Sequence, residues 1–154
     1  MNSAIKDLET TPKMSPFVLA LIANLVWINA SEIFRYFVFV MPMMREAFPL
    51  IPNIAPMNLP VFLIWGLWDT ILVLAATLLP FMAMKTYGSS LLQAIIYGTF
   101  VWMIVFVILW LGLYNMNLAT LNILAVALPL AWLEMVIASI IVWWFTSKDE
   151  ENTE

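Results

Sequence analysis

The chain has 154 residues, of which 64% are hydrophobic and only 10% are charged, and its mean hydropathy is +0.98. Soluble domains carry about 25% charged residues, so the lipid bilayer is the expected environment of this chain. The sequence contains no Cys and no His, which excludes disulfides, thiolate nucleophiles, histidine metal sites and a conventional catalytic triad. Its net charge of -4 does not indicate a basic surface of the kind that binds nucleic acid. We also expect no cofactor.

Four apolar segments are each long enough to cross a membrane as a helix. A helix needs about 20 residues to span the hydrocarbon core, and an isolated strand would leave its backbone polar groups unsatisfied in lipid. We therefore predict an all-α membrane protein, a four-transmembrane-helix bundle over residues 16–145. The predicted helices cover about 16–41, 60–84, 91–113 and 118–145, between a polar N-terminal segment, 1–15, and an acidic C-terminal tail, 146–154.

The connection over residues 42–59 is apolar and contains four prolines. Prolines in these positions exclude a continuous helix. A water-exposed loop is seldom this apolar, so the segment is expected to lie in the membrane interface or to cap the mouth of the bundle.

The charges of the connecting segments predict the orientation of the bundle. Only Arg45 lies on one side, whereas the other side carries Lys6, Lys13, Lys85 and Lys148. By the positive-inside rule, both the N- and C-termini are expected to be cytoplasmic. The expected location is a bacterial-type cytoplasmic (inner) membrane.

Four ionisable residues lie inside the predicted spans: Glu32 and Arg35 in the first, Asp69 in the second and Glu134 in the fourth. A charge at membrane depth costs at least ~2.5–3.5 kcal/mol, so such residues usually pair, line a wet cavity or do chemistry. A rise of about 1.5 Å per residue places all four in the central to outer part of the bilayer. They are therefore able to meet.

Helical spacing supports this convergence. Glu32 and Arg35 are spaced i,i+3 and can form an ion pair within one helix. Glu134 lies on a stripe of small residues, the pattern that lets membrane helices approach closely; these are Ala127, Ala131 and Ala138. If Arg35 neutralises one carboxylate, two remain, and we expect at least one of them to hold a proton or to meet a cation.

The leading hypothesis is a small integral membrane protein whose intramembrane pocket binds a proton, a cation or a small ligand, with transport as one form of that function. The candidate binding residues combine the four charges with two amides: Glu32, Arg35, Asp69, Glu134, Asn29 and Asn122. Aromatic side chains are expected to wall an organic ligand or to stack on a cation; they are Trp27, Trp65, Trp68, Trp132 and Tyr97. The third helix is expected to act mainly as a wall.

Two other functions stay open. The protein is a structural or accessory subunit of a membrane complex if the polar cluster only specifies helix packing. It is an intramembrane enzyme acting on a lipid or isoprenoid if a carboxylate performs acid–base chemistry, a role that we rank below a non-enzymatic one. The expected partners are the lipid bilayer and, because four helices leave little room for a conducting path, a second copy or a larger membrane complex.

Two families of four-helix membrane proteins carry acidic residues at positions similar to those in this chain. The position of Glu32 is similar to that of the central glutamate of small multidrug-resistance transporters. The acids on the first two helices, Glu32 and Asp69, and the segment Gln93–Tyr97 resemble features of the sterol-isomerase-like four-helix family. This chain has no histidine and carries an arginine one turn beyond Glu32, so no residue role is transferred from either family.

Overall fold

The structure is a computed structural model that describes residues 14–151, so most of the predicted polar segment 1–15 and the end of the acidic tail lie outside the described residues. Within this range the chain is helical and contains no strand. Four helical stretches are long and apolar enough to cross a membrane: Pro16–Ala47, Leu59–Tyr87, Leu91–Asn115 and Leu121–Lys148. The prediction of an all-α protein with four helices long and apolar enough to span a membrane is confirmed.

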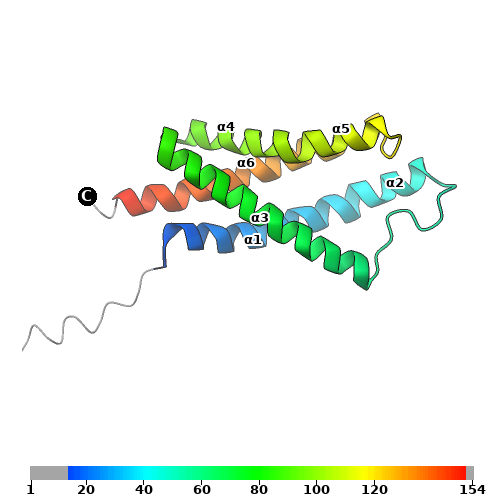
Figure 1. The fold of residues 1–154 in the computed structure, drawn as a ribbon, viewed down its shortest axis with the longest axis horizontal. Helices are drawn as coiled ribbons and strands as arrows, with labels where there is room; N and C mark the ends of the chain where they lie inside the picture. Colours follow the sequence, from blue (N-terminus) through cyan, green and yellow to red (C-terminus); the bar gives the residue numbers. More distant parts are fainter. Residues whose placement is uncertain (1–13, 152–154) are drawn as a thin grey trace, which may run out of the picture.

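Two of the four spans contain a short π-helical turn. The first comprises α1 (Pro16–Arg35), the turn η2 (Tyr36–Val40) and α2 (Met41–Ala47), and the second is α3 (Leu59–Tyr87). The third comprises α4 (Leu91–Trp102), the turn η3 (Met103–Val107) and α5 (Ile108–Asn115), and the fourth is α6 (Leu121–Glu151). The spans alternate in direction, and the start of α1 and the end of α6 lie at the same end of the bundle (Figure 1).

Polar side chains before the later spans determine where these helices begin. The side chains of Asn58, Ser90 and Thr120 accept hydrogen bonds from the backbone N–H three residues later, at 3.1, 3.2 and 3.4 Å. Such caps satisfy N–H groups that have no partner within the helix. The fourth helix therefore begins at Leu121, rather than at the predicted residue 118.

The first span continues past its predicted end, residue 41, to Ala47. Its π-helical turn closes with a hydrogen bond from the N–H of Met41 to the carbonyl of Tyr36. The change of hydrogen-bond register comes directly before Pro42, which has no N–H to contribute. Pro42 is therefore accommodated at the start of α2, and the part of the connection that is not helical begins after Ala47.

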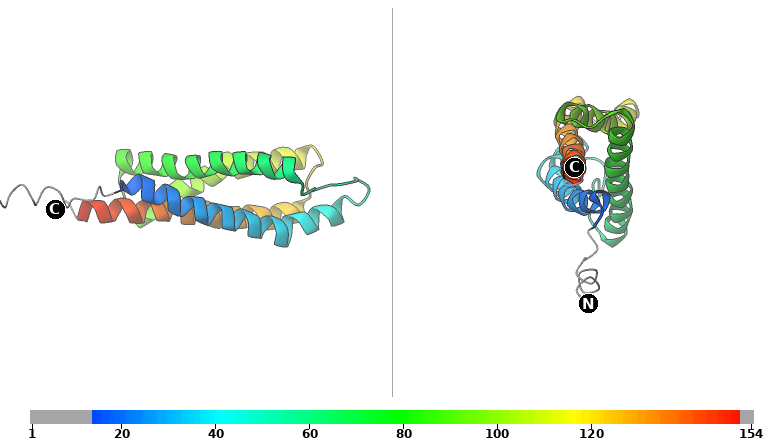
Figure 2. Two further views of the ribbon diagram at one scale, coloured as in Figure 1. Left: turned by 90° about the horizontal axis from the view of Figure 1, so that it is seen from below. Right: turned by 90° about the vertical axis from the view of Figure 1, so that its left-hand side faces the viewer.

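Helix α6 is the centre of the bundle because it packs against α1, α3 and α4. In the end view α6 lies between α4 and α1, and α3 runs along the opposite side of the bundle (Figure 2). Its small residues Ala127, Ala131 and Ala138 are fully buried, as the sequence predicted. At Gly98 of α4 an added Cβ would lie 2.7 Å from the backbone oxygen of Met135, so α4 and α6 are in backbone contact.

Helix α3 crosses the bundle obliquely. It packs against α1, α4 and α6, but its N-terminal half diverges from α5 and α2 (Figure 1). Side chains on this half are exposed, including Ile64 at 67% and Trp68 at 41%. The divergence opens the bundle on one side, beside the buried charges.

Candidate functional site

A buried ion-pair cluster joins the first and the last spans. Arg35, at the end of α1, forms an ion pair with Glu32 one turn earlier. Its Nη1 atom also lies 3.3 Å from Oε2 of Glu134 on α6. The side chains of Arg35, Glu32 and Glu134 are 7%, 12% and 0% exposed. One guanidinium group is therefore shared by two carboxylates from different helices.

Further contacts from α1 hold Glu134 in place. The hydroxyl of Ser31 donates a hydrogen bond to Glu134 Oε2 at 2.9 Å. Nε1 of Trp27 donates to the backbone carbonyl of Glu134 at 3.0 Å. The second carboxylate oxygen, Oε1, is buried and has no hydrogen-bond partner among the described residues. These contacts make Glu134 part of the interface between α1 and α6, and it does not line the cavity described below.

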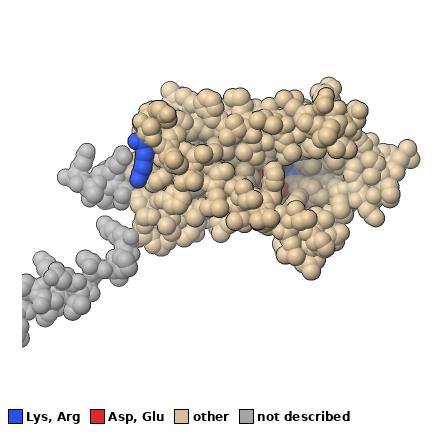
Figure 3. All heavy atoms as spheres, in the orientation of Figure 1, with Lys and Arg blue, Asp and Glu red and all other residues tan. Residues whose placement is uncertain are grey.

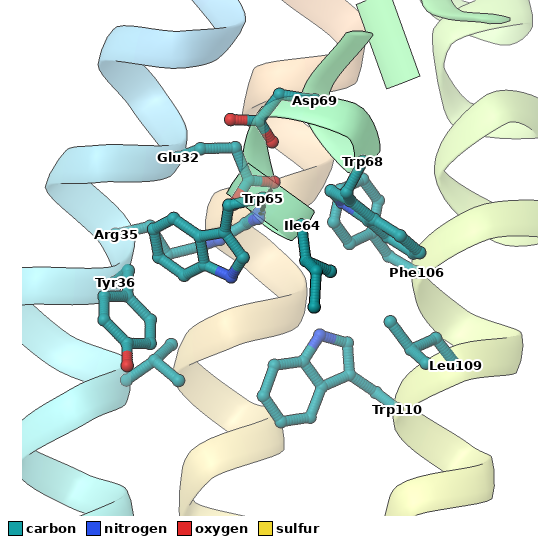
Figure 4. Close-up of a pocket in the computed structure, with 11 residues that line it drawn as sticks. Glu32, Arg35, Tyr36, Ile64, Trp65, Trp68, Asp69, Phe106, Leu109 and Trp110 are labelled. Atoms are coloured by element: carbon teal, nitrogen blue, oxygen red, sulfur yellow. Dashed lines mark hydrogen bonds and ion pairs between the residues drawn. The ribbon is translucent and has the colours of Figure 1, made fainter. Parts of the chain in front are cut away.

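Asp69 of α3 is placed differently from the other three charges. The residue is only 7% exposed, yet its carboxylate forms no hydrogen bond or ion pair with any residue in the range 14–148. It lines a cavity together with Glu32 and Arg35, and its carboxylate turns toward Glu32 (Figure 4). Asp69 is thus a buried acid that the described side chains leave without a partner.

The cavity beside these charges has a volume of about 320 Å³. Its polar end is formed by Glu32, Arg35 and Asp69, and the rest of its wall is apolar and mainly aromatic (Figure 4). The apolar lining residues are Tyr36, Val40, Ile64, Trp65, Trp68, Phe106, Leu109 and Trp110. This volume lies at the lower end of the range of about 300–1,000 Å³ that is typical of small-molecule sites.

The cavity is open to the lateral surface of the bundle. Three of its lining residues are exposed, Ile64 at 67%, Trp68 at 41% and Leu109 at 38%. They lie on α3 and α5, at the gap left by the divergence of α3. In the space-filling view, acidic and basic atoms are visible at the base of a hollow in a face that is otherwise almost uncharged (Figure 3).

Both π-helical turns adjoin the cavity. Tyr36 and Val40 belong to η2, and Phe106 belongs to η3. The ring of Phe106 lies 4.8 Å from the guanidinium carbon of Arg35. Such turns occur often at functional sites, because the changed register turns a side chain in a direction that a regular helix does not allow.

The remaining predicted site residues lie elsewhere. Asn29 donates to the carbonyl of Leu25 in its own helix at 2.8 Å, and Asn122 is exposed on α6. Of the predicted wall residues, Trp65 and Trp68 line the cavity. The other three contact different parts of the bundle: Trp27 bonds to Glu134, Trp132 donates to Thr99 Oγ1 at 3.0 Å, and Tyr97 donates to the Gly88 carbonyl at 3.3 Å.

Sequence reasoning assigned no site residue to the central part of the third span. Phe106 and Trp110 line the cavity from η3 and α5, so this span supplies a substantial part of the aromatic wall. Their spacing of four residues places them on one helical face, which is the feature of the sequence that points to a shared wall. This spacing alone does not assign them to a cavity, because membrane helices also direct aromatic side chains toward lipid.

The cavity combines groups that suit an amphipathic molecule. Its carboxylates and guanidinium can bind a polar group, and its rings can pack against an apolar one. In the described part of the chain, no three His, Cys, Asp or Glu side chains are grouped so that they could hold a metal ion.

Comparisons of this chain with protein-family models, with curated proteins and with solved structures found no match.

Proposed function

We propose that this small membrane protein binds a small amphipathic molecule, which enters the cavity from the bilayer through the gap between α3 and α5. The observation that carries the proposal is the cavity itself. It has charged groups at one end, aromatic walls, and exposed apolar residues at its opening. A ligand with a polar head and an apolar body matches this distribution.

A structural role is the second candidate, and the ion-pair cluster favours it. Arg35 joins Glu32 and Glu134 across two helices, and polar residues of this kind hold membrane helices together. Ligand binding and helix packing are assigned to different residues. Glu134 serves the packing of α1 against α6, and Asp69 faces the cavity.

We also propose an orientation of the bundle in the membrane. Lys85 and Lys148 lie at the end of the bundle where α1 begins, Lys6 and Lys13 precede α1 in the sequence, and Arg45 lies at the opposite end. This distribution favours cytoplasmic termini in a cytoplasmic membrane. The cavity adjoins the end of α1 and the first half of α3. In this orientation it lies in the outer half of the bilayer, and its ligand comes from the outer leaflet.

Binding can be tested through the intrinsic fluorescence of the eight tryptophans, three of which line the cavity. A bromoalkyl alcohol quenches the fluorescence of nearby tryptophans. Probe molecules dissolved in the lipid give quenching that rises linearly with probe concentration, whereas binding in the cavity adds a component that saturates. We expect this component for the wild type in nanodiscs. Leu109→Phe, which fills the opening, should remove it.

Leu111→Phe is the matched control, because Leu111 is exposed on the same helix but does not line the cavity. It should keep the saturable component. The proposal fails if the wild type shows only linear quenching, or if the two phenylalanine variants behave alike.

A further inference from the structure

The charges around the cavity do not balance. Arg35 is the one basic residue that lines it, and its guanidinium is already engaged by Glu32 and Glu134. The Asp69 residue is only 7% exposed, it lines the cavity, and it has no hydrogen-bond or ion-pair partner among residues 14–148. A buried carboxylate without a partner is unfavourable in a low-dielectric environment. A positive group on the ligand would remove this cost.

The walls of the cavity are suited to the same kind of ligand. Trp65, Trp68 and Trp110 line the same cavity as Asp69 (Figure 4). The faces of aromatic rings attract cations, and tryptophan does so most strongly. Phe106 already faces a cation, since its ring lies 4.8 Å from the guanidinium carbon of Arg35.

We infer that the ligand is an organic ammonium amphiphile, whose positive head lies between Asp69 and the tryptophan rings and whose apolar chain leaves through the gap between α3 and α5. This inference rests on the proposed function and names the class of its ligand. It assigns the recognition of charge to Asp69 and leaves the ion pair of Arg35 intact.

A metal cation fits the site less well than an ammonium group. Calcium is bound by six to eight oxygen ligands, and magnesium keeps an octahedral shell. The described residues contain no group of three acidic side chains arranged for a metal, and most of the cavity wall is carbon. An alkylammonium group needs one opposite charge and apolar or aromatic surroundings, which this cavity supplies.

The test compares two bromoalkyl probes of equal chain length, one with a trimethylammonium head and one with a hydroxyl head, in the quenching assay described above. For the wild type we expect the ammonium probe to bind at least about tenfold more tightly than the alcohol, as expected for a desolvated charge pair with a cation–π contact. Asp69→Asn should abolish this preference, so that the ratio of the two affinities falls to about one. Asp69→Glu, which restores the charge, should restore the preference.

Glu46→Gln is the control for a general loss of negative charge, because Glu46 is an exposed acid outside the cavity, and it should keep the preference. Equal binding of both probes by the wild type would overturn the inference and leave the proposed function standing. An unchanged preference in Asp69→Asn would overturn the role of Asp69. If neither probe shows saturable quenching, the proposed function itself fails.

Discussion

Arg35 of α1 and Glu134 of α6 form an ion pair across the centre of the bundle, with 3.3 Å between Nη1 and Oε2 and with side chains that are 7% and 0% exposed. The pair connects two helices that are distant in the sequence. Ser31 and Trp27, one and two turns before Arg35 on α1, also bond to Glu134. The stability of the bundle should therefore depend on Glu134 more than on the other acids.

Glu134→Ala should destabilise the bundle by about 3–5 kcal/mol, the usual cost when one member of a buried ion pair is removed. The substitution leaves Arg35 with Glu32 as its one remaining acidic partner among the described residues, and it opens a void in the interface. The measurement is the free energy of unfolding in mixed micelles titrated with a denaturing detergent. Glu46→Ala, which removes an exposed acid, should change it by less than about 0.5 kcal/mol.

Glu134→Gln separates charge from hydrogen bonding, because glutamine can still accept the hydrogen bond from Ser31. We expect a loss of stability smaller than that of Glu134→Ala but still measurable. A Gln variant as stable as the wild type would show that the charge of Glu134 contributes nothing to packing.

A second prediction concerns the buried amide of Asn24, which connects three spans. Its Nδ2 donates to Thr77 Oγ1 at 3.0 Å and to the carbonyl of Ala138 at 3.2 Å. Interhelical hydrogen bonds in membranes contribute about 0.6 kcal/mol on average and at most about 1.7 kcal/mol. A double-mutant cycle of Asn24→Ala and Thr77→Val should give a coupling energy in this range, measured by unfolding in mixed micelles.

The bond to Ala138 survives the Thr77→Val change, so that variant alone should cost less than Asn24→Ala. A coupling energy near zero would mean that the hydrogen bond between Asn24 and Thr77 does not contribute to stability.

A third prediction follows from the close approach of α4 and α6. In Gly98→Ala the new Cβ would lie 2.7 Å from both the backbone oxygen of Met135 and the Cα of Val136. Neither backbone atom can rotate away, so the two helices must separate. We expect a loss of stability of at least about 1–3 kcal/mol, as for overpacked interiors.

Gly112→Ala is the matched control, because an added Cβ there has nothing within 4 Å. It should be neutral or slightly stabilising, since alanine favours the helix over glycine by about 0.8–1.0 kcal/mol. If the two alanine variants have the same unfolding free energy, α4 and α6 are not in backbone contact in the membrane.

The fold could be predicted from the sequence because hydrocarbon thickness determines the length of a span and helical periodicity determines its faces. The stripe through Ala127, Ala131 and Ala138 was predicted in this way, and all three are buried. The extension of the first span through Pro42 was not, because it depends on the change of hydrogen-bond register at Met41.

The candidate site could be predicted only in part. Periodicity placed each acid on a face that points at protein, but it could not distinguish Glu134, which is enclosed by α1, from Asp69, which lines the cavity. That difference arises from the oblique course of α3, which follows from the packing of all four spans. The wall formed by Phe106 and Trp110 depends on the same divergence.

The fourth prediction is the orientation in the membrane, which can be tested by cysteine labelling because the chain has no cysteine of its own. Leu50, Met116 and Tyr87 are 94%, 59% and 75% exposed. The first two lie at one end of the bundle, in the turns after α2 and α5, whereas Tyr87 lies at the other end, at the end of α3 (Figure 1). With cytoplasmic termini, a membrane-impermeant maleimide added to spheroplasts should label Leu50→Cys and Met116→Cys. Tyr87→Cys should react only after the membrane is permeabilised.

The reverse pattern would place the termini outside and the cavity in the inner half of the bilayer. Different labelling of Leu50→Cys and Met116→Cys would contradict the four-span fold itself.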